Sequence, residues 1–225
     1  MCGRINLRMS PAELAAVFDL FREPDWSPRY NLGPMQLILA VRWNSGSVRQ
    51  ADLLKWGLVP GWAEDPKIGS RMFNARAETV ASKPSFRSAF RKRRCLIPAS
   101  GFYEWQQLSG KIKQPWNIVR TDGQPLALAG LWEHWTAPDG SILETCAVIT
   151  TTANEFMSEI HDRMPVILER ESWNLWLDPD ELEPAALTEL LVPCPSDLLQ
   201  RTPVSTLVNN VRNESPECVR PVDPI

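Results

Sequence analysis

Cys2 directly follows the initiator methionine in the opening MCGR. Because the cysteine side chain is small, methionine aminopeptidase is expected to remove Met1 and leave Cys2 with a free α-amine beside its thiol. The amine titrates at about 8 and the thiol at about 8.5, so both are partly nucleophilic at neutral pH. The sequence therefore predicts a 1,2-aminothiol at the mature N-terminus.

Two reactions suit this group, and both require the removal of Met1. The amine condenses with an aldehyde to an imine, and the neighbouring thiolate then closes a thiazolidine ring that is more stable than the imine. Alternatively, the thiol acts as an acyl-transfer nucleophile with its own amine as the base.

Either reaction needs proton transfer, and Glu104 and His161 are the candidate acid–base residues. Glu104 lies between Tyr103 and Trp105, whose rings would raise the pKa of its carboxyl if they exclude water. These neighbours alone, however, favour a strand glutamate that faces solvent. His161 stands between a predicted helix and an apolar run, where a helix-capping histidine is an equally good interpretation.

Asn74 and Arg76 add polar groups in the loop context of FNARAE, the first as an amide donor and the second as a cation. Five further cations lie between Arg87 and Arg94 in FRSAFRKRR. A run of this kind suits contact with a phosphate backbone, and a solvated helix face is an equally good interpretation.

The net charge of −3 hides a strong division along the chain. Residues 1–113 carry 18 Lys and Arg against 9 Asp and Glu, a balance of +9. Residues 114–225 carry 6 against 18, a balance of −12. This distribution, rather than the net charge, indicates a nucleic-acid partner.

Composition argues against several other classes of protein. The five cysteines are dispersed without a CxxC pair and there are two histidines, so neither a disulfide framework nor a metal site is predicted. Cys95 and Cys146 lie in apolar runs and are predicted to be buried, whereas Cys2 has no such setting. Without a bilayer-length apolar run or a signal peptide, the protein is expected in the cytoplasm, with no cofactor and no membrane contact.

The first third of the chain is predicted to hold one helix and one β-hairpin. A capping box begins at Ser10, and apolar residues at helical spacing extend the predicted helix over residues 11–21. Residues 36–43 and 51–59 are predicted strands joined across a turn at Asn44-Ser45-Gly46. Residues 56–78 are rich in proline and glycine and are predicted to be mostly loop.

The remainder combines strands with short helices. A helix is predicted over residues 83–93, short apolar strands fill the middle, and helical patterns return at 154–160, 171–177 and 180–191. Since no repeat or linker interrupts residues 1–225, we expect a single α+β domain. Its predicted core is an antiparallel β-sheet, resembling an open barrel, with flanking helices.

Six blocks of sequence together resemble the SRAP (SOS response-associated peptidase) family. They stand in the family's order, cover essentially the whole chain, and continue more loosely through VNNV at 208–211. The blocks are MCGR at the start, RYN at 29–31, WGLVPGW at 56–62, NARAE at 74–78, RRCLIPASGFYEW at 93–105 and IHDRMP at 160–165.

The resemblance implies a protein that guards abasic sites in single-stranded DNA. It implies a thiazolidine cross-link between the mature N-terminal cysteine and the C1′ aldehyde of the ring-opened deoxyribose. On this chain Cys2 would supply the amine and thiol, and Glu104 would be the acid–base group near the amine. His161 would protonate or stabilise the hydroxyl of the opened sugar, and Asn74 would hydrogen-bond the adduct.

The resemblance also implies contacts with the rest of the DNA. Arg4, Asn31, Arg76 and Trp105 match positions that contact phosphates or bases, and Pro34 matches the residue that wedges the strand open. Aromatic stacking suits this task, since it contributes about 1–3 kcal/mol per base. The expected partner is single-stranded DNA containing abasic sites, bound by a monomer that becomes nucleoid-associated.

Two features depart from the family pattern. Gly33 stands in RYNLGP where alanine is more usual. The stretch between Trp62 and Phe73 is longer than in the shortest relatives and lacks a tryptophan, which leaves a second wedge residue unassigned. Among the ten tryptophans, Trp132 and Trp173 are expected in the core rather than on DNA.

Other functions stay open at this point. The family name preserves the proposal of a peptidase that uses Cys2 on its own N-terminus or on another protein. Removal of a single methionine needs no self-cleavage, because an aminopeptidase suffices. A non-covalent single-strand binding module and a lyase step that cleaves the DNA are further alternatives.

Overall fold

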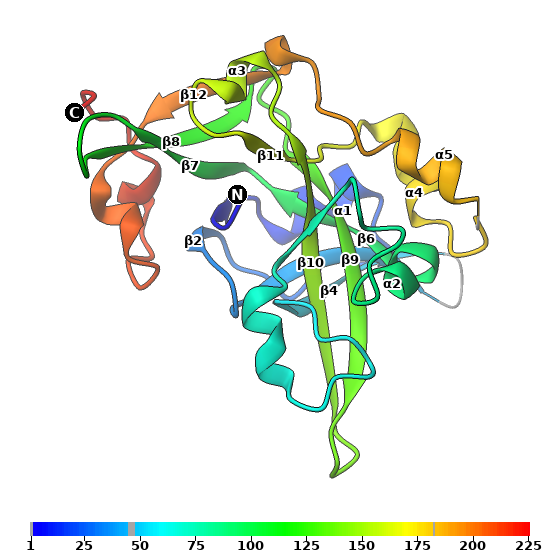
Figure 1. Ribbon diagram of the computed structural model, residues 1–225. Helices are drawn as coiled ribbons and strands as arrows, with labels where there is room; N and C mark the ends of the chain where they lie inside the picture. Colours follow the sequence, from blue (N-terminus) through cyan, green and yellow to red (C-terminus); the bar gives the residue numbers. More distant parts are fainter. Residues whose placement is uncertain (1, 45–47, 182) are drawn as a thin grey trace.

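The computed structural model describes residues 2–44, 48–181 and 183–225, which form two β-sheets with short helices around them (Figure 1). The first sheet has the strand order β12-β8-β7-β1-β2 and the second the order β11-β10-β4-β3-β6-β9, with β5 beside β10. In the first sheet the strands are β1 (Ile5–Leu7), β2 (Arg29–Leu32), β7 (Gly101–Gln107), β8 (Lys113–Arg120) and β12 (Leu199–Pro203). In the second they are β3 (Leu37–Trp43), β4 (Arg49–Trp56), β5 (Asn74–Arg76), β6 (Arg94–Ala99), β9 (Leu126–Thr136), β10 (Ile142–Thr152) and β11 (Arg163–Pro165).

Five strands of the second sheet pair in a ring, because β9 and β10 also pair with each other. The pairings are antiparallel except where β10 meets β4 and β5. A single residue pair, Val41 with Leu96, joins β3 to β6, so the ring is a partial barrel. The predicted α+β class with an antiparallel, open-barrel-like core is confirmed.

Burial explains why the middle strands are continuously apolar. All six residues of β6, which is the ring strand between β3 and β9, are buried. Cys95 and Cys146 are fully buried, as predicted. Trp173 is buried as expected, and Trp132 is partly buried against the same core.

The first helix begins as predicted and ends earlier. Ser10 caps α1 (Pro11–Phe18) with the full capping box, in which Ser10 and Glu13 bond each other's backbone. Asp19 then adopts a left-handed conformation with φ 52°, which stops the helix before the predicted residue 21. Phe21 is 70% exposed, so the prediction that the apolar face of the helix extends to residue 21 is wrong.

The other elements are shorter than the sequence patterns suggested. Strand β4 ends at Trp56, one residue before Gly57, whose φ is 149°. Gly57 packs closely against Gly69: a Cβ at Gly57 would lie 2.6 Å from the Gly69 carbonyl oxygen. The turn predicted at Asn44-Ser45-Gly46 extends outside the described residues. The remaining helices are α2 (Arg87–Lys92), α3 (Glu155–Ser158), α4 (Trp173–Leu177) and α5 (Pro184–Glu189), with 3₁₀ turns at Pro66–Arg71, Arg170–Ser172, Ser196–Leu198, Thr206–Asn209 and Pro216–Val219.

The cationic run at the end of α2 is only partly a surface feature. Arg94 is buried, and its guanidinium donates to the backbone carbonyls of Phe90 in α2 and of Trp176 in α4, the latter at 2.6 Å. Arg93 pairs with the buried carboxylate of Glu133 at 2.7 Å. Two of the five cations therefore stabilise the fold, which leaves Arg87, Arg91 and Lys92 exposed.

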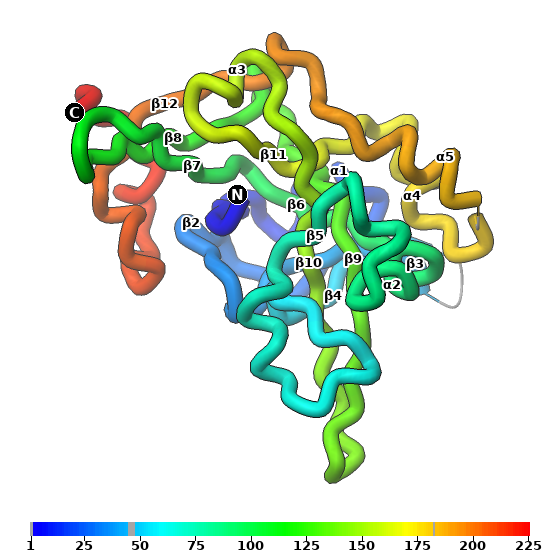
Figure 2. The backbone as a smooth tube through the Cα atoms, in the orientation of Figure 1, coloured from blue at the N-terminus to red at the C-terminus, as the bar shows by residue number. Residues whose placement is uncertain are grey.

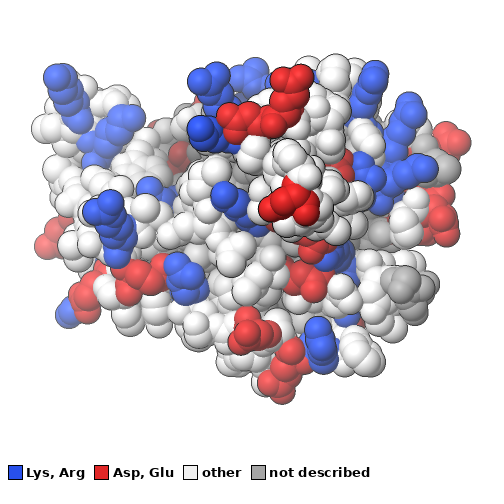
Figure 3. Space-filling view, turned by 90° about the horizontal axis from the view of Figure 1, so that it is seen from below, with Lys and Arg blue, Asp and Glu red and all other residues white. Residues whose placement is uncertain are grey.

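The two oppositely charged halves of the sequence interleave in the fold. Strand β10, from the acidic half, pairs with β4 and β5, from the basic half. Figure 3 shows Lys and Arg groups at separate places on one face, with Asp and Glu groups between them. None of the helices within the described ranges has the length and apolarity needed to cross a bilayer.

The fold places the start of the chain at its centre. Strand β1 lies between β7 and β2, so the residues that precede it run into the middle of the molecule. In the view of Figure 2 this N-terminal end lies near the middle, while the β9–β10 hairpin projects away from the body. The candidate residues of β7, β5 and the turn after α3 surround this point.

Candidate functional site

Cys2 is held in place by two neighbouring segments. The Tyr103 amide donates to the Arg4 carbonyl at 2.9 Å, which continues the pairing of β1 with β7. The Asn74 side-chain amide donates to the Cys2 carbonyl at 2.7 Å. Cys2 is fully buried within the main core, although its sequence neighbours had indicated no apolar setting. Burial raises the pKa of its thiol well above the usual range.

Glu104 is buried rather than solvent-facing. It lies on β7, so its assignment to a strand is confirmed, but only 3% of its surface is exposed and the solvent-facing orientation that its neighbours favoured is wrong. Burial raises the pKa of the Glu104 carboxyl, and the nearby His161 acts in the opposite direction. The Glu104 charge in turn adds to the rise in the thiol pKa of Cys2. Glu104 is therefore electrostatically coupled to both residues.

His161 occupies the turn between α3 and β11, as its sequence position predicted. Its Nδ1 accepts a hydrogen bond of 3.0 Å from the Arg163 amide, which suits a neutral ring with the proton on Nε2. The same Nδ1 lies 2.8 Å from an Asp162 carboxylate oxygen. Both contacts involve one ring nitrogen and place the His161 ring beside Asp162 and Arg163 in the turn.

The side chains of Asn74 and Arg76 lie on the same face of β5, because successive side chains alternate between the two faces of a strand. Asn74 points to Cys2, Ala75 is buried on the opposite side, and Arg76 is exposed. The parallel pairing of β5 with β10 fixes this orientation. The Oδ1 of Asn74 is buried with no hydrogen-bond partner in the described structure, so the amide that bonds Cys2 also carries an available acceptor.

Arg4 contacts both Asn31 of β2 and Trp105 of β7. The Arg4 guanidinium stands 5.6 Å from the centroid of the Trp105 ring and donates to Asn31 Oδ1 at 2.8 Å. Trp105 donates through Nε1 to Asn209 Oδ1 at 2.6 Å. Asn31 is fully buried, and its side chain is bonded within the protein. Contact between Asn31 and DNA would require this network to open.

Pro34 lies in the turn after β2, half-buried beside Met35, whose φ is +71°. At Gly33 an added Cβ would lie 3.0 Å from Val211 Cγ2 and 3.3 Å from Arg4 Nε. The glycine thus permits close approach of the C-terminal part of the chain. Sequence reasoning missed this packing, because it joins residues almost 180 positions apart.

The loop after β4 carries the most exposed tryptophan of the described residues, Trp62, at 62% exposure. It lines a surface hollow of about 520 Å³ together with Lys67 and Arg71. This hollow is lined by a different set of residues from those around Cys2. In the described part of the chain no three His, Cys, Asp or Glu side chains gather as metal ligands.

Comparison with known proteins gives consistent matches along the chain. The model of the family described as SOS response associated peptidase (SRAP) matches residues 1–211. The abasic site processing protein YoqW of Bacillus subtilis (strain 168) is 45% identical over 97% of this chain and 99% of its own. The abasic site processing protein HMCES of Gallus gallus is 33% identical over 99% of this chain and 78% of its own.

A solved structure agrees with these sequence matches. A protein from Bacteroides thetaiotaomicron has a TM-score of 0.88 and 26% sequence identity, over 98% of this chain and 100% of that one. The resemblance first indicated by six short blocks thus extends to the family model, the relatives and the fold. On this evidence from sequence and structure, the chain belongs to the SOS response associated peptidase (SRAP) family.

Proposed function

We propose that this protein processes abasic sites in single-stranded DNA by forming a thiazolidine cross-link through Cys2, once Met1 has been removed. The names of the relatives support the abasic-site role. The chemistry rests chiefly on one observation: a buried Cys2 is held by Asn74 next to the buried carboxyl of Glu104.

The first step is condensation of the Cys2 amine with the C1′ aldehyde of the opened sugar. The amine attacks the carbonyl carbon and gives a carbinolamine. Its hydroxyl leaves as water when an acid supplies a proton, and an iminium remains. Glu104 suits this acid role, because burial keeps its carboxyl protonated to a higher pH than usual.

The second step closes the ring. The Cys2 sulfur adds to the same carbon and forms the C–S bond, while the thiol proton passes to the Glu104 carboxylate. Burial disfavours a free thiolate, so removal of this proton during the addition is advantageous. Aldehyde and aminothiol together give thiazolidine and one water, without any other reactant.

The remaining residues orient the substrate in this proposal. Asn74 Oδ1 accepts a hydrogen bond from the adduct, and His161 serves the hydroxyl of the opened sugar as donor or acceptor. Arg76 is exposed on the same side of β5 as Asn74, where it contacts the phosphate of the strand that enters the site. Trp105, packed beside Arg4, and Pro34, in its turn, contact the neighbouring nucleotides.

A denaturing gel tests the proposal directly. Met-processed protein is mixed with a labelled single-stranded oligonucleotide carrying one abasic site, and with the same sequence intact. We expect a shifted band for the abasic strand, and none for the intact strand or the Cys2→Ala variant. Binding of both strands without a covalent band would favour the binding module. Cys2-dependent cleavage of the Met-extended precursor without aminopeptidase would favour the peptidase.

Substitution of Asn74 by alanine is expected to slow the cross-linking step about tenfold. The change removes the bond to the Cys2 carbonyl and the acceptor beside the adduct, and loss of about 1 kcal/mol or slightly more corresponds to this factor. Single-turnover rates at saturating DNA measure the effect. Arg76→Ala is the matched comparison from the same strand: it should raise the half-saturating DNA concentration and leave the maximal rate unchanged.

A further inference from the structure

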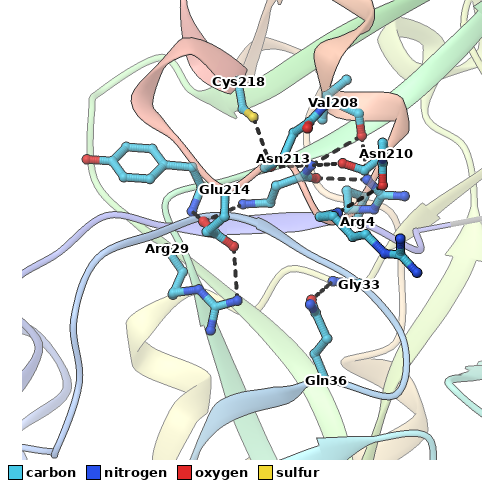
Figure 4. A network of polar contacts seen from close by, with 12 residues as sticks. Arg4, Arg29, Gly33, Gln36, Val208, Asn210, Asn213, Glu214 and Cys218 are labelled. Carbon is cyan, nitrogen blue, oxygen red and sulfur yellow. Dashed lines mark hydrogen bonds and ion pairs between the residues drawn. The ribbon is translucent and has the colours of Figure 1, made fainter.

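The segment from residue 205 to residue 219, here called the C-terminal clamp, packs against the strands that hold Cys2. It contains two 3₁₀ turns, Thr206–Asn209 and Pro216–Val219, and a loop between them. The family match ends at residue 211, so part of the clamp lies beyond it. Figure 4 shows its side chains and carbonyls meeting those of Arg4 and β2.

Asn31 is the centre of this contact. Its side-chain amide donates to the carbonyls of Asn210 at 3.0 Å and Asn213 at 2.9 Å, and a third carbonyl, that of Val208, lies within 3.4 Å. Its Oδ1 accepts from Arg4, whose same Nη1 also donates to the Val208 carbonyl. Both ends of the Asn31 side chain are thus bonded inside the protein.

Glu214 attaches the clamp to the backbone of β2. One carboxylate oxygen accepts hydrogen bonds from the amides of Tyr30 and Asn31, the latter at 3.2 Å. The other pairs with Arg29 at 3.0 Å. Bonds of this kind between a carboxylate and backbone amides are stronger than neutral hydrogen bonds. The clamp cannot move away from β2 without breaking them.

The N-terminal strand needs such support. Strand β1 has three residues, and its pairing with β2 changes register between Ile5 and Leu7. Cys2 lies before the strand, so the β1–β2 ladder does not reach it. Gly3 and Arg4 connect Cys2 to this ladder. Asn31 and the Val208 carbonyl of the clamp bond the side chain of Arg4, and β7 bonds its carbonyl.

We propose that Asn31 and Glu214 are positioning residues, which hold the clamp on Arg4 and thereby fix Cys2 beside Glu104 and Asn74. This inference rests on the proposed function. It gives Asn31 a role inside the protein in place of the expected contact with DNA, because its buried side-chain amide already donates to two carbonyls and its Oδ1 already accepts from Arg4. Reactions of this type are sensitive to displacement of the nucleophile by an ångström or less.

The test uses two aldehydes, abasic single-stranded DNA and glyoxylate, which carries neither phosphodiester nor base. In Glu214→Gln the amide loses the charge that binds the two backbone amides and Arg29. We expect about a tenfold lower maximal rate of cross-linking, a half-saturating DNA concentration within about twofold of the unmodified protein, and the same loss with glyoxylate. Glu214→Asp should recover part of both rates.

Glu217→Gln is the matched control, since Glu217 lies in the same segment and its carboxylate pairs with Arg220 on the surface. It should leave both rates unchanged. Glu214 is a safer site for substitution than the fully buried Asn31, because 28% of its side chain is exposed.

Two results would overturn the inference: unchanged rates in Glu214→Gln, or a raised half-saturating DNA concentration with a normal glyoxylate rate, which indicates a DNA contact. Failure of the unmodified protein to react with either aldehyde would refute the proposed function itself and is recognised before any variant is compared.

Discussion

Replacement of Cys2 by serine is expected to abolish the denaturation-resistant adduct with abasic DNA while leaving an imine that borohydride traps. Serine keeps the α-amine, so condensation with the aldehyde still occurs. Its hydroxyl is a far poorer nucleophile than a thiol, and the five-membered ring does not close. We expect the stable adduct to fall about 100-fold or more without borohydride, and to return as a reduced secondary amine with it.

A serine substitution at another buried cysteine shows whether the effect is specific to Cys2. Cys194→Ser is the matched control, because Cys194 is also buried and lies outside the proposed site. It should cross-link at the normal rate without borohydride. A Cys2→Ser protein that still forms a heat-stable adduct without reductant would show that the thiol is not part of the product.

Replacement of Glu104 by glutamine is expected to slow cross-linking by about 10²–10³-fold, within the range that general acid–base groups contribute. Loss of the Glu104 charge removes one of the causes that raise the thiol pKa of Cys2, so that pKa should fall. A thiol that ionises more easily while the reaction becomes slower identifies proton transfer as the missing function. Rates and thiol alkylation measured across pH 5–9 give both quantities.

The same variant should be more stable than the parent protein at neutral pH. Burial raises the pKa of Glu104, so the folded protein binds its proton more tightly than the unfolded chain does. That contribution is complete below the ordinary carboxyl pKa and is lost as the pH rises through the raised value. Glutamine avoids the buried charge, and each kcal/mol recovered should raise the Tm by about 2–4 °C.

The stability advantage of Glu104→Gln over the parent protein should therefore be largest at pH 7–8 and vanish at about pH 4. Glu133→Gln provides a comparison at a second buried carboxylate, one that pairs with Arg93 at 2.7 Å. Its substitution leaves a guanidinium without its partner and should lower the Tm. A lower Tm for Glu104→Gln at every pH would show that the buried charge is not the dominant cost at that position.

Local sequence patterns predicted the parts of the fold that depend on local interactions. The Ser10 capping box, a strand predicted at residues 36–43 and the burial of Cys95 and Cys146 follow from spacing and hydropathy. The capping box and the two burials are confirmed, and the strand is found at Leu37–Trp43. The end of the first helix was wrong, because a left-handed Asp19 interrupts an apolar pattern that continues to Phe21. Hydrophobic spacing alone does not register such a stop.

The candidate site depends on contacts that no local pattern contains. Asn74 meets Cys2 across 72 positions, and Asn31 meets Asn213 across 182. The burial of Glu104 follows from the packing of β7 beside β1, not from its aromatic neighbours alone. The basic run shows the same dependence, since Arg93 bonds Glu133 across 40 positions and Arg94 bonds Trp176 across 82.

The central claim is that the amine and the thiol of Cys2 both bond to one carbon of the abasic sugar. Mass spectrometry of the N-terminal peptide, after nuclease and protease digestion of the adduct, tests it most directly. The account predicts a sugar attached to Cys2 with the loss of one water, and a Cys2 thiol that iodoacetamide no longer alkylates. A sugar attached to a lysine, or an adduct whose Cys2 thiol is still alkylated, would contradict it.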